Sequence, residues 1–145
     1  MDCNEVLESR ERMDQFVAAW ETGTLPKSRW THAAHVAVCS VLIVRYPDDA
    51  LVRMTEGITR YNESVGTVNS DTSGYHATLT RFWFDVLSKR LAGYTDEWRA
   101  ARDAVAEFGD ARDLHSRFYS FDVIRNREAR LVWVAPDLLD HRSAF

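Results

Sequence analysis

The sequence predicts an all-α protein, a compact bundle of about five to six helices with an irregular C-terminal segment. Apolar residues recur at helical spacing through five segments, and polar or Gly- and Pro-containing breaks separate these segments. Strand-like residues are confined to one short stretch, 129–135, which has no second strand to pair with. A length of 145 residues suits one hydrophobic core, so we expect a single helical domain over residues 1–145.

The first two predicted helices cover residues 4–21 and 30–45. In the first helix, apolar residues at helical spacing alternate with acids and arginines, and a Gly-Thr-Leu-Pro sequence at 23–26 ends it. The second helix is apolar nearly all round, so we expect it in the middle of the domain. Ser28 or Thr31 is placed to cap its N-terminus.

Three more helices are predicted in the middle of the chain, and they cover about residues 50–62, 75–92 and 96–108. Asp48 or Asp49 is placed to cap the first of these, and Thr95 or Asp96 the last. The polar segment 63–74 is the longest break in periodicity. Loops of this length in compact domains are often functional, so we expect it to act as a lid.

The last third of the chain is less regular. Short helices are expected at 110–119 and 122–128. Residues 129–135 are expected to form extended chain that packs across the helices, because a lone strand has no partner. A final turn or short helix is expected from Pro136 onward.

The composition describes an ordinary globular chain with a surplus of aromatic residues. Hydrophobic residues make up 46% and charged residues 28%, whereas the aromatic share reaches 12% and includes five Trp. The aromatic surplus indicates large core side chains or an aromatic-lined pocket, and it is compatible with a homodimer. The net charge of −4, with arginines scattered among acids, argues against a nucleic-acid partner.

The ends and the cysteines bear on location. Residues 1–15 are polar and acidic and lack the pattern of a signal peptide. The longest apolar run, 33–44, is too short to span a bilayer, so no membrane partner is expected. Cys3 and Cys39 are the only cysteines, which argues against a disulfide framework. We therefore expect a cytoplasmic protein.

A pair of histidines is the sharpest chemical signal. His32 and His35 lie three residues apart in Trp-Thr-His-Ala-Ala-His, so they share a helix face, and His76 opens the fourth predicted helix. If the second and fourth helices pack, three imidazoles meet, and three protein ligands leave positions open for water or substrate. Imidazole suits Fe, Zn, Cu and Ni. This pattern predicts a small metal-dependent enzyme in which these histidines are metal ligands and catalytic residues for a small-molecule substrate.

Three alternatives stay open at this point. A carboxylate such as Glu63 or Asp71 could join the site or replace one histidine as a ligand. The same histidines could also work without metal, as acid/base groups of an enzyme or as hydrogen-bonding groups of a small-ligand-binding or accessory protein. Packing alone is the third interpretation of the pattern.

Aromatic and polar neighbours of the histidines are the candidate substrate-binding residues, and they are Trp30, Tyr61, Asn62, Tyr75, Thr80 and Arg81. For Arg81, an ion pair with Asp85 four residues on is the favoured alternative. His115 lies among charged residues and is expected to face solvent, and His141 is expected in a mobile tail.

Three motifs carry a resemblance to known proteins: Trp-Thr-His-Ala-Ala-His-Val at 30–36, Tyr-Asn-Glu at 61–63 and Gly-Tyr-His-Ala-Thr-Leu-Thr-Arg at 74–81. In these motifs the chain resembles a family of small bacterial proteins to which no activity attaches. The resemblance implies no reaction or cofactor. It concentrates on the three histidines and the loop between them, which favours a site there.

Overall fold

The computed structural model describes residues 3–145, and all regular secondary structure within them is helical. The predicted all-α bundle is thereby confirmed. The helices are α1 (Cys3–Val6), α2 (Arg10–Thr22), α3 (His32–Arg45), α4 (Ala50–Ser64), α5 (Ala77–Arg90), α6 (Glu97–Phe108) and α7 (Arg127–Leu131), with 3-10 turns at Lys27–Arg29 and Leu114–Arg117. None of the helices in this part of the chain has the length and apolar character that crossing a membrane requires.

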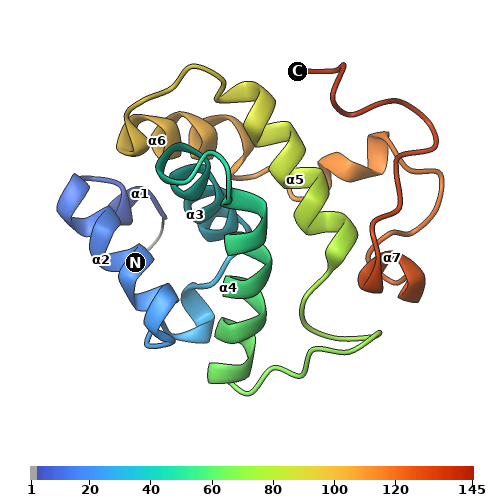
Figure 1. The fold of residues 1–145 in the computed structure, drawn as a ribbon, viewed down its shortest axis with the longest axis horizontal. Helices are drawn as coiled ribbons and strands as arrows, with labels where there is room; N and C mark the ends of the chain where they lie inside the picture. The colour runs from blue at the N-terminus through green and yellow to red at the C-terminus, as the bar shows by residue number, and fades with distance from the viewer. Residues whose placement is uncertain (1–2) are drawn as a thin grey trace.

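Helix α3 is the centre of the bundle, as its all-round apolar sequence predicts. It packs against α4, α5 and α6, which surround it in Figure 1. Eight of its residues are buried, so hydrophobic burial on several sides holds it in place. Thr31 caps the helix by accepting a hydrogen bond from the Ala34 N–H at 3.2 Å, and one of the two predicted caps is thereby confirmed.

The first predicted helix is two helices. The chain leaves helical geometry between α1 and α2, where the Ser9 hydroxyl accepts a hydrogen bond from the Arg12 N–H at 3.1 Å and caps α2. Leu7 is buried in this break, and its carbonyl oxygen accepts a hydrogen bond from the Trp98 indole N–H at 2.8 Å. A local cap and one long-range hydrogen bond therefore override the continuous apolar periodicity.

The predicted irregular C-terminal segment is confirmed, although its short helix, α7, begins later in the chain than expected. Asn126 caps α7 by accepting a hydrogen bond from the Ala129 N–H at 2.8 Å, so the prediction of a helix at 122–128 is wrong. The chain beyond α7 is extended and is fixed by Thr78 of α5. The Thr78 hydroxyl donates to the Val132 carbonyl at 2.9 Å and accepts from the Val134 N–H at 3.0 Å. Figure 1 shows this segment beside α5.

Helices α2 and α4 meet at a glycine. A Cβ atom at Gly57 would lie 2.2 Å from Cη2 of Trp20, so only glycine admits the indole ring at this point. Trp20 is buried, and its ring stacks on Trp30 with centroids 5.4 Å apart. Trp30 in turn contacts His35, with centroids 3.9 Å apart. The glycine thus sets the position of an aromatic stack that ends at the first turn of α3.

Substituting Gly57→Ala tests this contact. Alanine is favoured over glycine in a helix by about 1 kcal/mol, but overpacking a core costs about 1–3 kcal/mol. We therefore expect the variant to have a lower free energy of unfolding in urea than the wild type. In a Trp20→Phe background the smaller ring leaves room, and the same substitution should cost less or stabilise. An equal cost in both backgrounds would show that the Trp20 contact is not the reason for the glycine.

Candidate functional site

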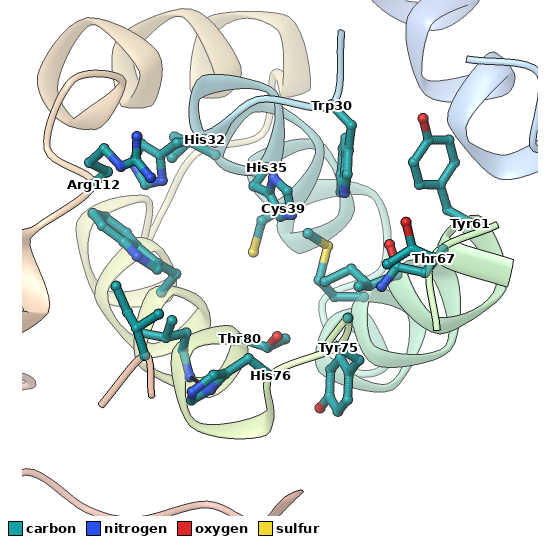
Figure 2. Close-up of a pocket in the computed structure, with 18 of the residues that line it drawn as sticks. Trp30, His32, His35, Cys39, Tyr61, Thr67, Tyr75, His76, Thr80 and Arg112 are labelled. Carbon is teal, nitrogen blue, oxygen red and sulfur yellow. Dashed lines mark hydrogen bonds between the residues drawn. The ribbon is translucent and has the colours of Figure 1, made fainter. Parts of the chain in front are cut away.

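A cavity of about 510 Å³ lies between α3, α4 and α5, and the chain segments that precede α5 and follow α6 complete its wall. This volume is within the usual range for small-molecule sites. Apolar and aromatic side chains make up most of the wall, among them Val36, Met54, Ile58, Leu79, Trp83 and Ile124. Figure 2 shows the polar side chains spaced around the cavity, with His32 and Arg112 on one side and Thr67 and Tyr75 on the other.

Eight of the nine residues that the sequence nominates line this cavity, and they are Trp30, His32, His35, Tyr61, Asn62, Tyr75, His76 and Thr80. They come from α3, α4, α5 and the chain just before α3 and α5. The ninth, Arg81, does not line it. The sequence motifs therefore converge on one cavity, as the predicted packing of the second and fourth helices implies.

His35 presents an unprotonated nitrogen to the cavity. Its Nδ1 lies 2.8 Å from the Thr31 carbonyl oxygen, and a carbonyl can only accept, so Nδ1 carries the proton. The neutral ring then has a bare Nε2 at its far end, and this atom forms no hydrogen bond with any residue of the described chain, 3–145. Desolvation lowers the pKa of His35 to about 4, so the ring is neutral at pH 7.

His76 has the opposite tautomer and a structural role. Its Nδ1 accepts a hydrogen bond from the Leu79 N–H at 3.1 Å and so caps α5. Its Nε2–H donates to the Val123 carbonyl at 2.8 Å. Both ring nitrogens are used, and the side chain is buried with 7% of its surface exposed. Desolvation, the largest cause, lowers the pKa of this imidazole.

His32 also donates to a backbone carbonyl. Its Nε2 lies 3.0 Å from the carbonyl oxygen of Phe108, at the end of α6. The ring packs on Trp83 with centroids 4.9 Å apart. Desolvation, helped by the charge of Arg112, lowers the pKa of His32. These three histidines therefore differ in which nitrogen carries the proton, Nδ1 in His35 and Nε2 in His32 and His76, although all three are held in the neutral form.

The three histidines do not assemble as a metal donor set in this arrangement. His76 would have to give up its helix cap or its bond to Val123 to bind an ion. Among residues 5–145, whose side chains the structure describes, there is no group of three or more His, Cys, Asp or Glu placed to hold a metal. Neither Glu63 nor Asp71 lines the cavity, and Asp71 lies 4.0 Å from Arg127 instead. The predicted Fe, Zn, Cu or Ni site stays a prediction for which these residues offer no fit.

His115 and Arg112 line the cavity, although the sequence did not nominate either of them as a site residue. His115 is buried with 7% exposure and lines the cavity, so the expectation that it faces solvent is wrong. Its Nδ1 is buried without a hydrogen-bond partner among the described residues. Arg112 also lines the cavity. Both residues follow α6, and their direction depends on where α6 ends against α3. The sequence of 110–119 has no periodicity that indicates which of its side chains turn inward.

Asparagine side chains connect the loop before α5 to α4, and the role of this loop as a lid stays a prediction. Asn62 donates to the Asn69 amide oxygen at 3.0 Å, and the same oxygen accepts from the Tyr75 N–H at 2.9 Å. Asn69 Nδ2 donates to the Thr59 carbonyl at 3.1 Å. Gly74 has φ +77°, and a Cβ there would lie 2.6 Å from the Val68 carbonyl oxygen. Asn62 thus shapes the cavity as well as lining it.

The two remaining aromatic candidates have hydroxyl partners within the protein. Tyr61 donates to the Leu25 carbonyl at 2.7 Å, and only 1% of this residue is exposed. The Tyr75 hydroxyl lies 3.3 Å from Thr55 Oγ1. Tyr61 is therefore a wall residue, whereas Tyr75 is half-buried at the cavity edge.

Cys39 lines the cavity too, and burial raises the pKa of its thiol to about 12, which makes it a poor nucleophile.

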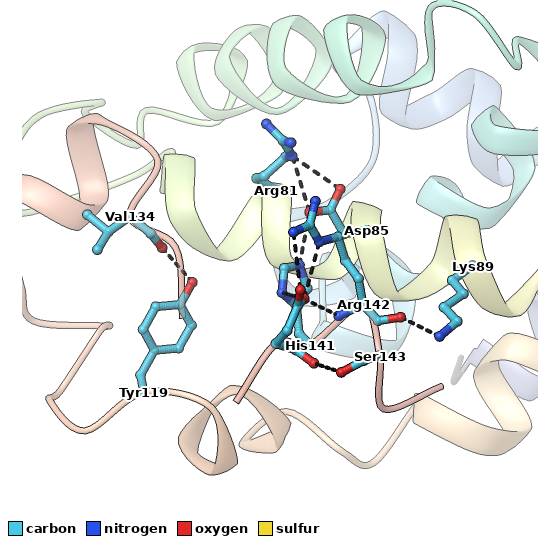
Figure 3. A network of polar contacts seen from close by, with 9 residues as sticks. Arg81, Asp85, Lys89, Tyr119, Val134, His141, Arg142 and Ser143 are labelled. Atoms are coloured by element: carbon cyan, nitrogen blue, oxygen red, sulfur yellow. Dashed lines mark hydrogen bonds and ion pairs between the residues drawn. The ribbon is translucent and has the colours of Figure 1, made fainter. Parts of the chain in front are cut away.

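Arg81 belongs to a separate polar network, shown in Figure 3. Its Nε donates to both carboxylate oxygens of Asp85, at 3.1 and 3.2 Å, and its guanidinium lies over the Trp133 ring. The favoured ion pair is confirmed, and the substrate-binding role in the cavity is not supported. His141 joins Asp85 at 2.9 Å and has 2% exposure, so the expectation that it lies in a mobile tail is wrong. Lys89 donates to the Arg142 carbonyl.

Comparisons of the chain with protein-family models, with curated proteins and with solved structures give no match. The function is therefore argued from the cavity itself.

Replacing His76 tests its structural role. His76→Ala removes the α5 cap and leaves the Val123 carbonyl unpaired, which should lower the free energy of unfolding by about 2–3 kcal/mol in urea. His76→Asn keeps a capping oxygen and should recover about 1 kcal/mol of this loss. If His76→Ala were as stable as the wild type, the ring nitrogens would be free for another role.

The depressed pKa of His35 predicts a pH dependence of stability. The unfolded chain takes up the His35 proton near its ordinary pKa of 6.5, whereas the folded chain takes it up near 4. Stability should therefore fall as the pH decreases from 6.5 to about 4, and this contribution should cease below that. We expect wild type to lose roughly 1–3 kcal/mol more than His35→Gln across this interval, measured by urea unfolding at each pH. Parallel losses in the two proteins would contradict a neutral, desolvated His35.

Proposed function

We propose that the protein binds a small organic molecule in this cavity and that His35 accepts a hydrogen bond from it through Nε2. Apolar walls with few, fixed polar groups are the usual composition of small-molecule sites. This is the metal-free interpretation of the histidine pattern. The three-histidine metal enzyme stays a prediction without support from the donor geometry, and a cytoplasmic location and a homodimer remain predictions from composition.

The orientation of His35 carries the proposal. The Thr31 carbonyl fixes the tautomer, and Trp30 packs against the ring face with an interplanar angle of 32°. Both partners belong to the same chain segment, so the acceptor is held before any ligand arrives. A group that is already oriented loses little conformational entropy on binding, which favours specific recognition of an N–H or O–H donor.

The titratable groups favour binding over catalysis by the cavity residues alone. A general base works best with a pKa near the operating pH, and the pKa of His35, at about 4, is far below it. The pKa values of His32, His76 and His115 are also lowered, chiefly by desolvation. Cys39 remains a thiol. Neutral histidines of this kind serve as hydrogen-bonding groups.

Matched pairs of aromatic fragments test the acceptor. Phenol and indole each carry a donor that anisole and N-methylindole lack. We expect ligand-observed NMR to show phenol and indole bound to the wild type, with mutual competition. His35→Leu should weaken these two by about 5–30-fold, because one hydrogen bond to a buried acceptor is lost, and should change anisole and N-methylindole little.

His141→Gln is the matched control, since it alters a buried histidine outside the cavity and keeps a donor for Asp85. It should bind all four fragments as the wild type does. Equal binding of phenol and indole to wild type and His35→Leu would contradict the acceptor role. Failure of all four fragments to bind at about 5 mM would contradict the proposed function.

A further inference from the structure

We infer that the molecule bound in this cavity is an organic acid, with an anionic group held near Arg112 and an apolar body against the hydrophobic wall. This inference rests on the proposed function, and it names the chemical class of the ligand. Three separate observations support this inference: the charges that line the cavity, the unpaired guanidinium of Arg112, and the apolar character of the wall.

The cavity has a charge bias opposite to that of the whole chain. The protein has 22 acidic residues against 18 Lys and Arg, so an average patch of its surface is slightly acidic. The charged residues that line the cavity are Lys27 and Arg112, and no Asp or Glu of the described residues lines it. A cavity with one sign of charge and low-dielectric walls focuses its field on a ligand of opposite sign. The bias therefore favours an anion.

Arg112 has a guanidinium available for a ligand. The residue is exposed and lines the cavity, and its guanidinium forms no ion pair or hydrogen bond with the residues whose side chains the structure describes, 5–145. Asp110 and Asp113 are its near neighbours in sequence, yet neither lines the cavity. A planar guanidinium with free N–H groups matches a carboxylate in a bidentate geometry. By contrast, the arginine ion pairs of the described residues involve no residue that lines the cavity.

The side of the cavity at Arg112 is also where His32 lies, as Figure 2 shows. Desolvation is the largest cause of the lowered pKa of His32; the charge of Arg112 also lowers this pKa, whereas the hydrogen bond to Phe108 and the charges of Asp113 and Asp110 raise it. An anion bound at Arg112 would offset the charge of Arg112. His35 and Cys39 lie along the wall between this side and Tyr75, so a molecule extending from Arg112 toward Tyr75 passes His35.

The rest of the wall suits an apolar body. Trp83 packs at the Arg112 side against His32, and Leu79, Met54 and Ile58 continue the apolar surface. A free inorganic anion would leave this surface unfilled. An aryl- or alkyl-carboxylate pairs with the Arg112 guanidinium and also buries apolar surface, which contributes about 25 cal/mol per Å². A neutral molecule buries the apolar surface but does not pair with the guanidinium.

A panel matched in shape and different in charge tests the inference. The probes are phenylacetate, 4-phenylbutyrate and octanoate, each with the primary amide and the primary amine of the same skeleton. We expect each acid to bind the wild type at least about 10-fold more tightly than its amide or amine, by ligand-observed NMR competition at low salt. Arg112→Glu should remove this preference while changing amide affinities by less than about 3-fold.

Arg99→Glu is the control, because it makes the same charge change at an exposed position of α6 that does not line the cavity. It should bind the acids as the wild type does. Amides or amines that bind as tightly as the acids would overturn the inference but leave the proposed function standing, since the cavity would still hold a small molecule. Acid binding unaffected by Arg112→Glu would overturn it equally. Failure of the whole panel to bind at about 5 mM would overturn both.

Discussion

Three backbone carbonyl groups determine the chemistry of this cavity, because each accepts a hydrogen bond from the protonated ring nitrogen of one histidine. The carbonyls of Thr31, Phe108 and Val123 hold His35, His32 and His76 in defined neutral tautomers. A carbonyl cannot donate, so the free nitrogen of each ring is an acceptor. For His76 that acceptor caps α5, and for His35 it remains available to a ligand. The same residue type thus has a structural role in one wall and a proposed binding role in another.

The aromatic surplus of the sequence holds these histidines in place. Trp20 and Trp30 form the stack behind His35, and the close approach of α2 to α4 at Gly57 sets that stack. Behind His32, Trp83 packs edge-on against Phe108, whose ring also meets Phe145 in the C-terminal segment. The C-terminal segment therefore supports the element whose carbonyl fixes His32, which connects the irregular end of the chain to the cavity.

Local patterns were sufficient to predict the longer helices and eight of the residues that line the cavity. The apolar sequence of α3 predicted its central place, and Thr31 and Asp96 were named among the candidate caps. Tertiary contacts decided what local patterns could not: the break at Ser9, the inward turn of Arg112 and His115, and the burial of His141 against Asp85. The use of both His76 ring nitrogens within the protein could not be predicted either, since histidine is outside the usual capping residues.

The tautomers of the cavity histidines test the account most directly. Long-range ¹H–¹⁵N correlation spectra at pH 7, assigned with single His→Gln variants, report which ring nitrogen carries the proton. The account predicts an Nδ1–H tautomer for His35 and Nε2–H tautomers for His32 and His76. An Nε2–H tautomer or a doubly protonated ring at His35 would contradict it, because the cavity would then present a donor where a free acceptor is proposed.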